Sequence, residues 1–345
     1  MKDHYEVTIG IPVYRSVKYI KETIFSALGQ TFPDIEFLIV DDCGNDGSMD
    51  VISLLQSSHS RGDDIRILRN DKNRGVSYSR NLIIDEAKGS YLYFMDSDDL
   101  IEPDTIRILH DALIQNQVQI VYASYEIIDK VGKTPPQVYK KASLILKGEG
   151  KLAIYAFKNN HVFHVSVCNS LINLLFLRQT GIRFIEANYW EDMAFTTELV
   201  IKVGKAVLLS DVTYHYNRWP DSLSHYQNRL HLEKWEILKN VFVVDYIKEK
   251  CHSMRGMPYL PYLGYVLEMN SFYMVCHIFK LSHNIVPPFT YQEMRNIMRH
   301  PLSIQDIVRS HHKLIANIVY YLLGKMPILF FVPSIWLAGK LKRVL

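Results

Sequence analysis

Three carboxylates lie close together in the segment FMDSDDL, at Asp96, Asp98 and Asp99. Asp96 and Asp98 are two positions apart, so both side chains point to the same side of an extended segment. Carboxylates this close repel one another unless a cation lies between them, and hard oxygen ligands suit Mg²⁺ or Mn²⁺ that bridges phosphate oxygens. A solvated acidic turn before the helix expected at Pro103, with Asp99 and Glu102 near its start, explains the spacing almost as well.

A second acidic pair, Asp41 and Asp42, directly follows the apolar run at residues 37–40. If that run is a strand parallel to the one before FMDSDDL, both acidic segments lie at the same edge of the sheet. An aspartate at this edge can accept hydrogen bonds from a base or a ribose. An Asx-type turn through Asp42, Gly44 and Asn45 accounts for the same residues, and both interpretations can hold together.

Alternating elements must position these acidic segments. Short apolar runs that read as strands are separated by stretches with helical periodicity. Strands that alternate with helices imply an α/β fold with a mainly parallel sheet, covered on both faces, over about the first 125 residues. The expected strands are residues 7–11, 37–40, 65–68 and 91–95.

The alternation ends after Tyr125, and from Gln227 onward the pattern is helical. We therefore expect one domain over residues 1–225 and a helical region over residues 226–345. Near the end, residues 314–339 carry a single charge, but prolines interrupt them, so neither half reaches the ~20 residues of a membrane-spanning helix. This stretch either lies in a membrane interface or packs against the protein or a homodimer partner.

The composition is that of a globular protein, with 345 residues, 48% of them hydrophobic and 22% charged. Lysine and arginine exceed aspartate and glutamate by only three, 39 against 36, which argues against a nucleic acid partner. The four cysteines form no CxxC pair, and the first residues lack the apolar run of a secretory signal. Both features lead us to expect a cytoplasmic protein.

Four segments resemble, in order and spacing, the conserved blocks of family 2 glycosyltransferases: VTIGIPVYR, EFLIVDDCGNDGS, NDKNRGVSYSRN and YLYFMDSDD. The resemblance covers about residues 5–225 and implies the nucleotide-diphospho-sugar transferase fold, which is GT-A-like. It also implies the inverting transfer of a sugar from a nucleoside-diphosphate sugar, with UDP as the expected nucleotide. The acceptor implied is a saccharide or a lipid-linked saccharide, as in cell-surface polysaccharide synthesis.

The same resemblance implies which positions contact the donor. The nucleoside pocket would be lined by Pro12, Val13 and Tyr14, and the base would be contacted by Asp42. The donor would be flanked by Gly75 and Arg80. Asp96 would lie near the ribose, and Asp98 would coordinate Mn²⁺ or Mg²⁺.

The segment NYWEDMAFTTEL resembles the family's Glu-Asp block, in which the aspartate begins a helix beneath the acceptor and serves as catalytic base. The resemblance therefore implies that Asp192 is the base and that Glu191 contacts substrate. Without the resemblance, an N-cap role for Asp192 is the simpler interpretation.

A last block, YHYNRW from Tyr214, resembles the family segment that closes over the donor. It implies that His215 contacts the metal or the diphosphate. Alternation along Tyr214, His215 and Tyr216 also fits an ordinary strand histidine whose ring is satisfied locally.

Two other functions stay open on the sequence. A sugar-phosphate nucleotidyltransferase would carry a glycine-rich basic loop after its first strand, whereas no glycine lies between Gly10 and Gly29 here. A catalytically silent module that binds sugar nucleotides would not need Asp98 and Asp192, both of which are present.

Overall fold

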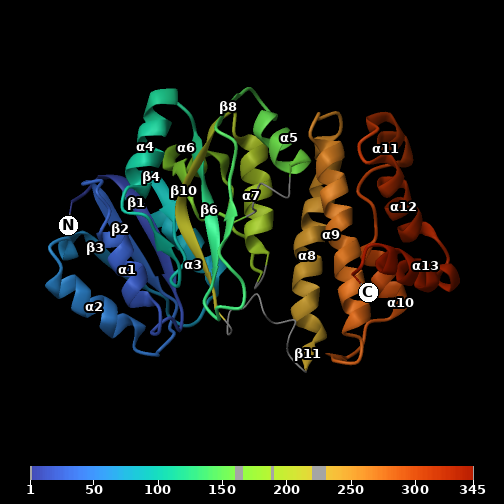
Figure 1. Cartoon of the computed structure of the whole chain (residues 1–345), viewed down its shortest axis with the longest axis horizontal. Coiled ribbons are helices and arrows are strands. Elements are labelled where there is room, and N and C mark those ends of the chain that lie inside the picture. Colours follow the sequence, from blue (N-terminus) through green and yellow to red (C-terminus); the bar gives the residue numbers. More distant parts are fainter. Residues whose placement is uncertain (1, 160–165, 188–189, 220–230, 345) are drawn as a thin grey trace. The chain divides into compact units, whose positions relative to one another are not determined.

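The computed structural model describes residues 2–159, 166–187, 190–219 and 231–344 (Figure 1). The chain divides into two compact units. The sheet unit comprises residues 1–152, 162–186 and 191–222, and the helical unit comprises residues 153–161, 187–190 and 223–345. The boundary expected after residue 225, and the helix start expected near Gln227, both lie outside the described residues, so the domain limits stay a prediction.

The sheet unit contains the expected alternation of strands and helices. Its strands are β1 (Tyr5–Val13), β2 (Ile35–Asp41), β3 (Ile65–Arg69), β4 (Gly89–Phe94), β5 (Leu100–Ile101), β6 (Ile120–Asp129), β7 (Gln137–Tyr139), β8 (Leu144–Lys147), β9 (Ser170–Asn173) and β10 (Lys205–Arg218). Its helices are α1 (Ile20–Leu28), α2 (Ser48–Ser58), the 3₁₀ turn Gly62–Asp64, α3 (Val76–Glu86), α4 (Thr105–Asn116), α6 (Leu174–Thr180) and α7 (Glu191–Lys202), while α5 (Lys151–Lys158) straddles the division between the units.

The sheet has the strand order β3-β2-β1-β4-β9-β6-β10-β5, with β7 added on β6 and β8 on β10. The expected parallel part is confirmed for β3, β2, β1 and β4, and β6 also runs parallel to β10. Strand β9, however, runs antiparallel between β4 and β6, and β5, β7 and β8 are antiparallel as well. The whole sheet is therefore mixed rather than mainly parallel.

Helix α3 packs directly on β1 and β2. A Cβ atom added at Gly10 of β1 would come within 2.4 Å of the Ile83 side chain, so only glycine allows α3 to lie this close to the strand. At the other end, Gly75 precedes α3 with φ +85°, a conformation that glycine adopts without strain. Two glycines thus set the position and the first turn of α3.

The helical unit is built around two long helices, α8 and α9, which pack against each other. No helix in the described ranges is long and apolar enough to cross a membrane. The elements of this unit are β11 (Leu232–Glu233), α8 (Lys234–Lys250), the 3₁₀ turn Cys251–Met254, α9 (Leu260–Lys280), β12 (Ile285–Val286), α10 (Tyr291–Ile297), α11 (Ile304–Ser310), α12 (Leu314–Lys325) and α13 (Ile328–Leu341).

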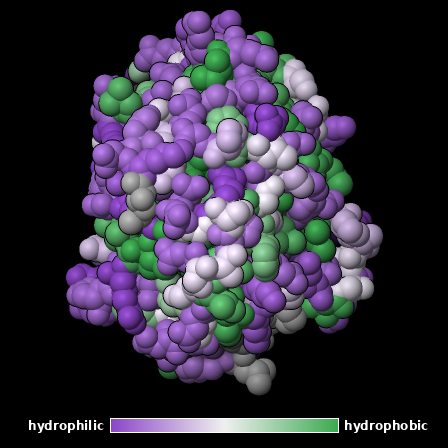
Figure 2. Space-filling model, turned by 90° about the vertical axis from the view of Figure 1, so that its left-hand side faces the viewer, coloured by the Kyte–Doolittle hydropathy of each residue, from purple (hydrophilic) through white to green (hydrophobic). Residues whose placement is uncertain are grey.

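Figure 2 shows the face of the molecule on the side where α2 lies in Figure 1. This face is mostly hydrophilic, and its hydrophobic residues form small separate patches. Such a distribution is usual for a surface that faces water.

One charged pair lies inside the helical unit. The ammonium of Lys248 on α8 lies 2.5 Å from Oε1 of Glu268 on α9 and donates to Ser271 Oγ at 2.8 Å and to the Ile297 carbonyl at 2.9 Å. Glu268 is fully buried, and its burial raises the pKa of its carboxyl although Lys248 opposes the rise. The pair joins α8, α9 and α10 through charge-assisted hydrogen bonds.

We expect Lys248→Met to lower the free energy of unfolding by about 3–5 kcal/mol, because removing one partner leaves the other charge buried and unpaired. Urea denaturation of the full chain measures the change. The matched control is Lys280→Met, which removes an exposed lysine at the end of α9. Equal stability of the two variants would contradict a structural role for the pair.

Candidate active site

One buried arginine joins the acidic residues that the sequence singled out. Nη2 of Arg80 on α3 donates to Oδ1 of Asp96, just after β4, at 2.8 Å. Nη1 donates to Oε1 of Glu191 at 2.8 Å and to Oδ1 of Asp192 at 2.5 Å, both at the start of α7. The Arg80 side chain is only 4% exposed. We call this group of four residues the Arg80 cluster.

The start of α3 is held by Asp42. Its Oδ1 accepts from the backbone N–H of Arg74 and the Asn70 amide, each at 2.7 Å, and its Oδ2 accepts from the Gly75 N–H at 2.8 Å. A carboxylate offers about four acceptor positions, so one remains on Oδ2 for a ligand. Asp42 therefore positions α3, and through it Arg80, while its expected contact with a base stays a prediction.

Burial changes the pKa of Asp192, the residue expected to be the base. Burial raises the pKa of Asp192 to about 7; Glu191 and Asp96 add to the rise, whereas Arg80 opposes it. The Asp192 side chain remains 21% exposed, so a water molecule or a hydroxyl group can reach it. A carboxylate with a pKa near neutrality, in contact with solvent, suits general base catalysis.

Asp99 does not cap the helix that follows it. Its buried carboxylate accepts from the Tyr214 hydroxyl at 2.6 Å and from the Asn217 backbone N–H at 2.8 Å. Burial raises the pKa of Asp99 well above its usual value, with Asp98 and Asp96 adding to the rise. A solvated acidic turn at the start of the next helix is therefore the wrong interpretation of Asp99, because α4 begins only after Asp104 and the buried Asp99 instead joins the acidic segment to β10.

The backbone of Asp98 is hydrogen-bonded to residues at the end of β10. Its carbonyl accepts from Asn217 Nδ2 at 2.8 Å and from Trp219 Nε1 at 3.4 Å, while its side chain stays partly exposed. Within the described ranges, no group of three or more His, Cys, Asp or Glu side chains is arranged to hold a metal ion. The role of Asp98 as a metal ligand stays a prediction.

His215 lies on β10 between two carboxylates. Its Nδ1 lies 2.7 Å from Oε1 of Glu126, and its Nε2 lies 2.7 Å from Oε1 of Glu102. Both ring nitrogens are engaged, so metal binding by His215 would require one of these partners to leave. Its role as a metal ligand stays a prediction.

A cavity of about 330 Å³ lies at the carboxyl ends of β1 and β2. Val13 and Asp41 line it, together with polar residues of the loop before α2. Its volume is at the lower end of the usual range for ligand sites, about 300–1,000 Å³. Pro12 is half-buried beside it, and Tyr14 is 42% exposed with the Arg15 guanidinium 5.2 Å from its ring centre. The role of this edge as the expected nucleoside pocket stays a prediction.

Comparisons with known proteins agree with this fold. The family model described as glycosyl transferase family 2 matches residues 8–179. The chain is 25% identical over 251 residues to the Bacillus subtilis glycosyltransferase TuaG, whose name assigns it to teichuronic acid biosynthesis; the match covers 72% of this chain and 91% of TuaG. The alignments with several other curated relatives cover less than half of each relative.

Two solved structures show the same fold. S. aureus TarS in complex with UDP-GlcNAc has a TM-score of 0.65 at 17% identity, over 92% of this chain and 90% of that one. The mannosyltransferase PcManGT from Pyrobaculum calidifontis, in complex with GDP-Man and Mn²⁺, has a TM-score of 0.53 at 15% identity, over 94% and 88% of the two chains.

The fold is that of a GT-A-type glycosyltransferase. The chain belongs to glycosyltransferase family 2. This membership confirms the resemblance found in the sequence and favours sugar transfer over the nucleotidyl transfer that the sequence left open.

We expect Arg80→Lys to lower the rate of sugar transfer by roughly 10²-fold, because one ammonium cannot hold three carboxylates in the geometry of a guanidinium, and small misplacements of reacting groups cost this much. Release of nucleoside diphosphate measures the rate. The control is Arg74→Lys, an exposed arginine paired with Asp71. Wild-type turnover in Arg80→Lys would show that the cluster does not position the site.

Proposed function

We propose that the protein transfers a sugar from a UDP-sugar to a saccharide or lipid-linked saccharide acceptor during cell-surface polysaccharide synthesis, with inversion at the anomeric carbon. The observation that carries the proposal is the Arg80 cluster, which brings the matching residues Asp96 and Asp192 onto one guanidinium. The UDP-GlcNAc complex of TarS supports UDP as the nucleotide. The teichuronic acid assignment of TuaG supports a surface polymer as the product.

Asp192 is the base in this mechanism. A hydroxyl group is a poor nucleophile until its proton is removed, and Asp192 takes that proton as the oxygen attacks the anomeric carbon. The new C–O bond forms on the face opposite the diphosphate, and the old C–O bond breaks as the nucleoside diphosphate leaves with its electrons. Arg80 keeps the base oriented, because its Nη1 donates both to Asp192 and to the neighbouring Glu191.

Asp98 is the proposed metal ligand. It follows β4 at the edge of the sheet, its side chain is partly exposed and its backbone is fixed to β10. A single carboxylate completed by phosphate oxygens and water fits Mg²⁺ or Mn²⁺, which keep several waters and need no cage of protein ligands. When bound, such an ion neutralises the charge that develops on the leaving diphosphate. The Mn²⁺ complex of PcManGT supports this proposal.

We expect Asp192→Asn to retain donor binding but to lose transfer by about 10²- to 10⁴-fold. In the wild type, transfer should rise with pH and level off above about pH 7, since the base acts only when deprotonated and its pKa is about 7. The rising limb should vanish in the variant. Glu198→Gln on the same helix is the control, and unchanged turnover in Asp192→Asn would overturn the assignment of the base.

A thermal-shift panel of nucleotide sugars, with and without Mn²⁺, tests donor and metal together, because a ligand that binds only the native state raises the unfolding midpoint. We expect UDP-sugars with Mn²⁺ to give the largest shift in the wild type, and Asp98→Ala to abolish the dependence on Mn²⁺. Asp211→Ala, on β10, is the control variant. Equal shifts with and without the metal would argue against a metal site at Asp98.

We also propose that the helical unit docks on the inner face of a membrane, in the cytoplasm. The stretch 314–344 contains no aspartate or glutamate, and its charges are Lys325, Lys340, Lys342 and Arg343. Apolar side chains of α12 and α13 are strongly exposed: Ile315, Val319, Leu322, Leu329, Phe330, Trp336, Leu337 and Leu341. An apolar helix face bordered by cations and carrying a tryptophan suits an anionic lipid surface. The free cysteines, among them Cys168 and Cys276, agree with a reducing compartment.

The double variant Leu329→Glu/Leu337→Glu tests the docking. We expect the wild type to sediment with phosphatidylglycerol-containing vesicles and the variant to stay in the supernatant, because charges on the apolar face oppose insertion. Leu54→Glu, an exposed leucine of α2, is the control. A protein that forms a dimer in equilibrium sedimentation and binds no vesicles would contradict the proposal.

A further inference from the structure

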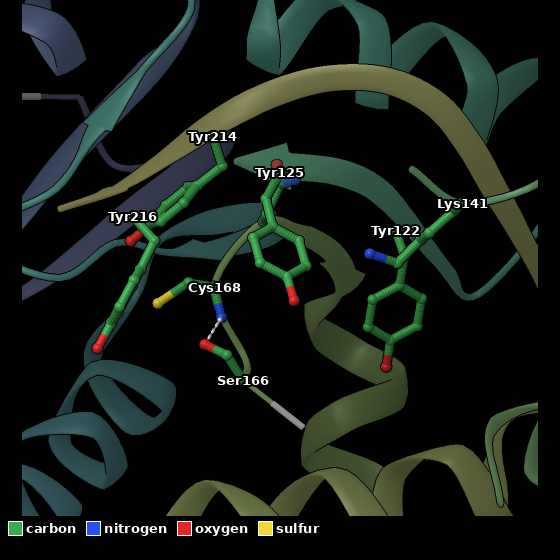
Figure 3. A pocket seen from close by; sticks show the side chains of 8 residues that line it. Tyr122, Tyr125, Lys141, Ser166, Cys168, Tyr214 and Tyr216 are labelled. Carbon is green, nitrogen blue, oxygen red and sulfur yellow. Dashed lines mark hydrogen bonds between the residues drawn. The ribbon is translucent and has the colours of Figure 1, made fainter. Parts of the chain in front are cut away.

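A buried lysine opens onto a pocket that the proposed mechanism does not use. Lys141, between β7 and β8, is 6% exposed. Figure 3 shows its ammonium between the rings of Tyr122 and Tyr125. The ammonium donates to the Ala123 carbonyl at 2.8 Å and lies 5.1 Å from the centre of the Tyr125 ring. The pocket is lined by Tyr122, Tyr125, Lys141, Ser166, Cys168, Asn169, Tyr214 and Tyr216.

Among the described residues, this ammonium has no counter-ion. Throughout the described ranges, no carboxylate lies within ion-pair distance of Lys141, and Ala123 accepts its hydrogen bond as a neutral group. An ammonium has three donors, and burying it without an anion is costly. Burial accordingly lowers the pKa of Lys141 to about 8. An oxyanion in the pocket would supply the missing charge and the missing acceptors.

The pocket adjoins the proposed base from the side away from the nucleoside. Cys168 lies close enough to Arg80 and Asp192 for their charges to influence its thiol, and the Val167 N–H donates to Asp192. Another lining residue, Tyr214, donates its hydroxyl to Asp99. In the sheet, β6 and β10 lie on one side of β4, whereas β1 and β2, which carry the expected nucleoside contacts, lie on the other. A ligand in the pocket therefore lies on the side of β4 opposite the expected nucleoside contacts, where the proposed function requires the acceptor.

The enclosed space is about 20 Å³. That is room for about one water molecule, so it can admit an oxygen of an acid group but not a sugar ring. The ring of the ligand must stay outside, on the side of the pocket that faces the Arg80 cluster.

We propose that this pocket binds an acidic group, a carboxylate or a phosphate, on the acceptor saccharide, and that Lys141 makes the enzyme select acidic over neutral acceptors. The inference rests on the proposed function, because it assumes that the acceptor enters beside Asp192. Lys141 is a specificity residue here and takes no part in the proton transfer.

Calorimetric titration of the whole 345-residue chain, saturated with UDP and Mn²⁺, tests the proposal with three probes: methyl glucoside, methyl glucuronide and methyl glucoside 6-phosphate. We expect one of the acidic probes to bind about 10- to 100-fold more tightly than the neutral one, the worth of a charge-assisted hydrogen bond. The preferred probe identifies the acid group as carboxylate or phosphate. Lys141→Met should remove the preference, and Lys140→Met, which removes the exposed neighbouring charge, should retain it.

Two results would overturn the proposal: equal binding of all three probes by the wild type, or an undiminished acid preference in Lys141→Met. Lys141→Gln is a second variant in case Lys141→Met unfolds, and the unfolding midpoint of each variant is measured first. The shift of that midpoint with UDP reports on the proposed function separately. An acid preference that depends on Lys141 but persists without any UDP binding supports the pocket and counts against the donor assignment.

Discussion

The contact of one guanidinium with three carboxylates governs the arrangement of this protein. Asp96 follows β4, whereas Glu191 and Asp192 begin α7, about a hundred residues later in the chain, and three such groups would repel one another without Arg80 between them. Arg80 in turn depends on where α3 lies. Gly10 allows the helix to approach β1, and Asp42 holds the backbone of the two residues that precede the helix.

The Arg80 cluster has more acidic than basic side chains, and this difference explains its chemistry. One arginine faces three carboxylates in a largely buried site, so burial and mutual repulsion keep the pKa of Asp192 at about 7 rather than near 4. A base with this pKa can accept a proton from a hydroxyl at neutral pH and release it afterwards. Lys141 is the converse case, a cation whose burial lowers its pKa and which has no anion beside it among the described residues. The protein thus holds an excess of negative charge at the base and an excess of positive charge in the neighbouring pocket.

Local patterns in the sequence predicted much of this fold. The strand expected at residues 37–40 is the centre of β2, and the helix expected after Gly75 is α3, because apolar periodicity and glycine placement act over short distances. The antiparallel insertion of β9 beside β4 was not predictable in this way, since its pairing joins Leu92 to Ile172. The same limit explains the error over Asp99, whose partners Tyr214 and Asn217 lie more than a hundred residues away. Local patterns likewise did not predict that Asp96 and Asp192 share a contact with Arg80, although the sequence pointed to each of the three residues.

The central claim is that Arg80 acts on catalysis through Asp192, and a double-mutant cycle on the rate of sugar transfer tests it most directly. The account predicts that Arg80→Lys/Asp192→Asn is no slower than Asp192→Asn alone, because an arginine that positions the base has nothing left to position once the base is gone. The account would be contradicted if the double variant lost rate by the product of the two single-variant losses. That result would mean that Arg80 and Asp192 contribute to the reaction independently.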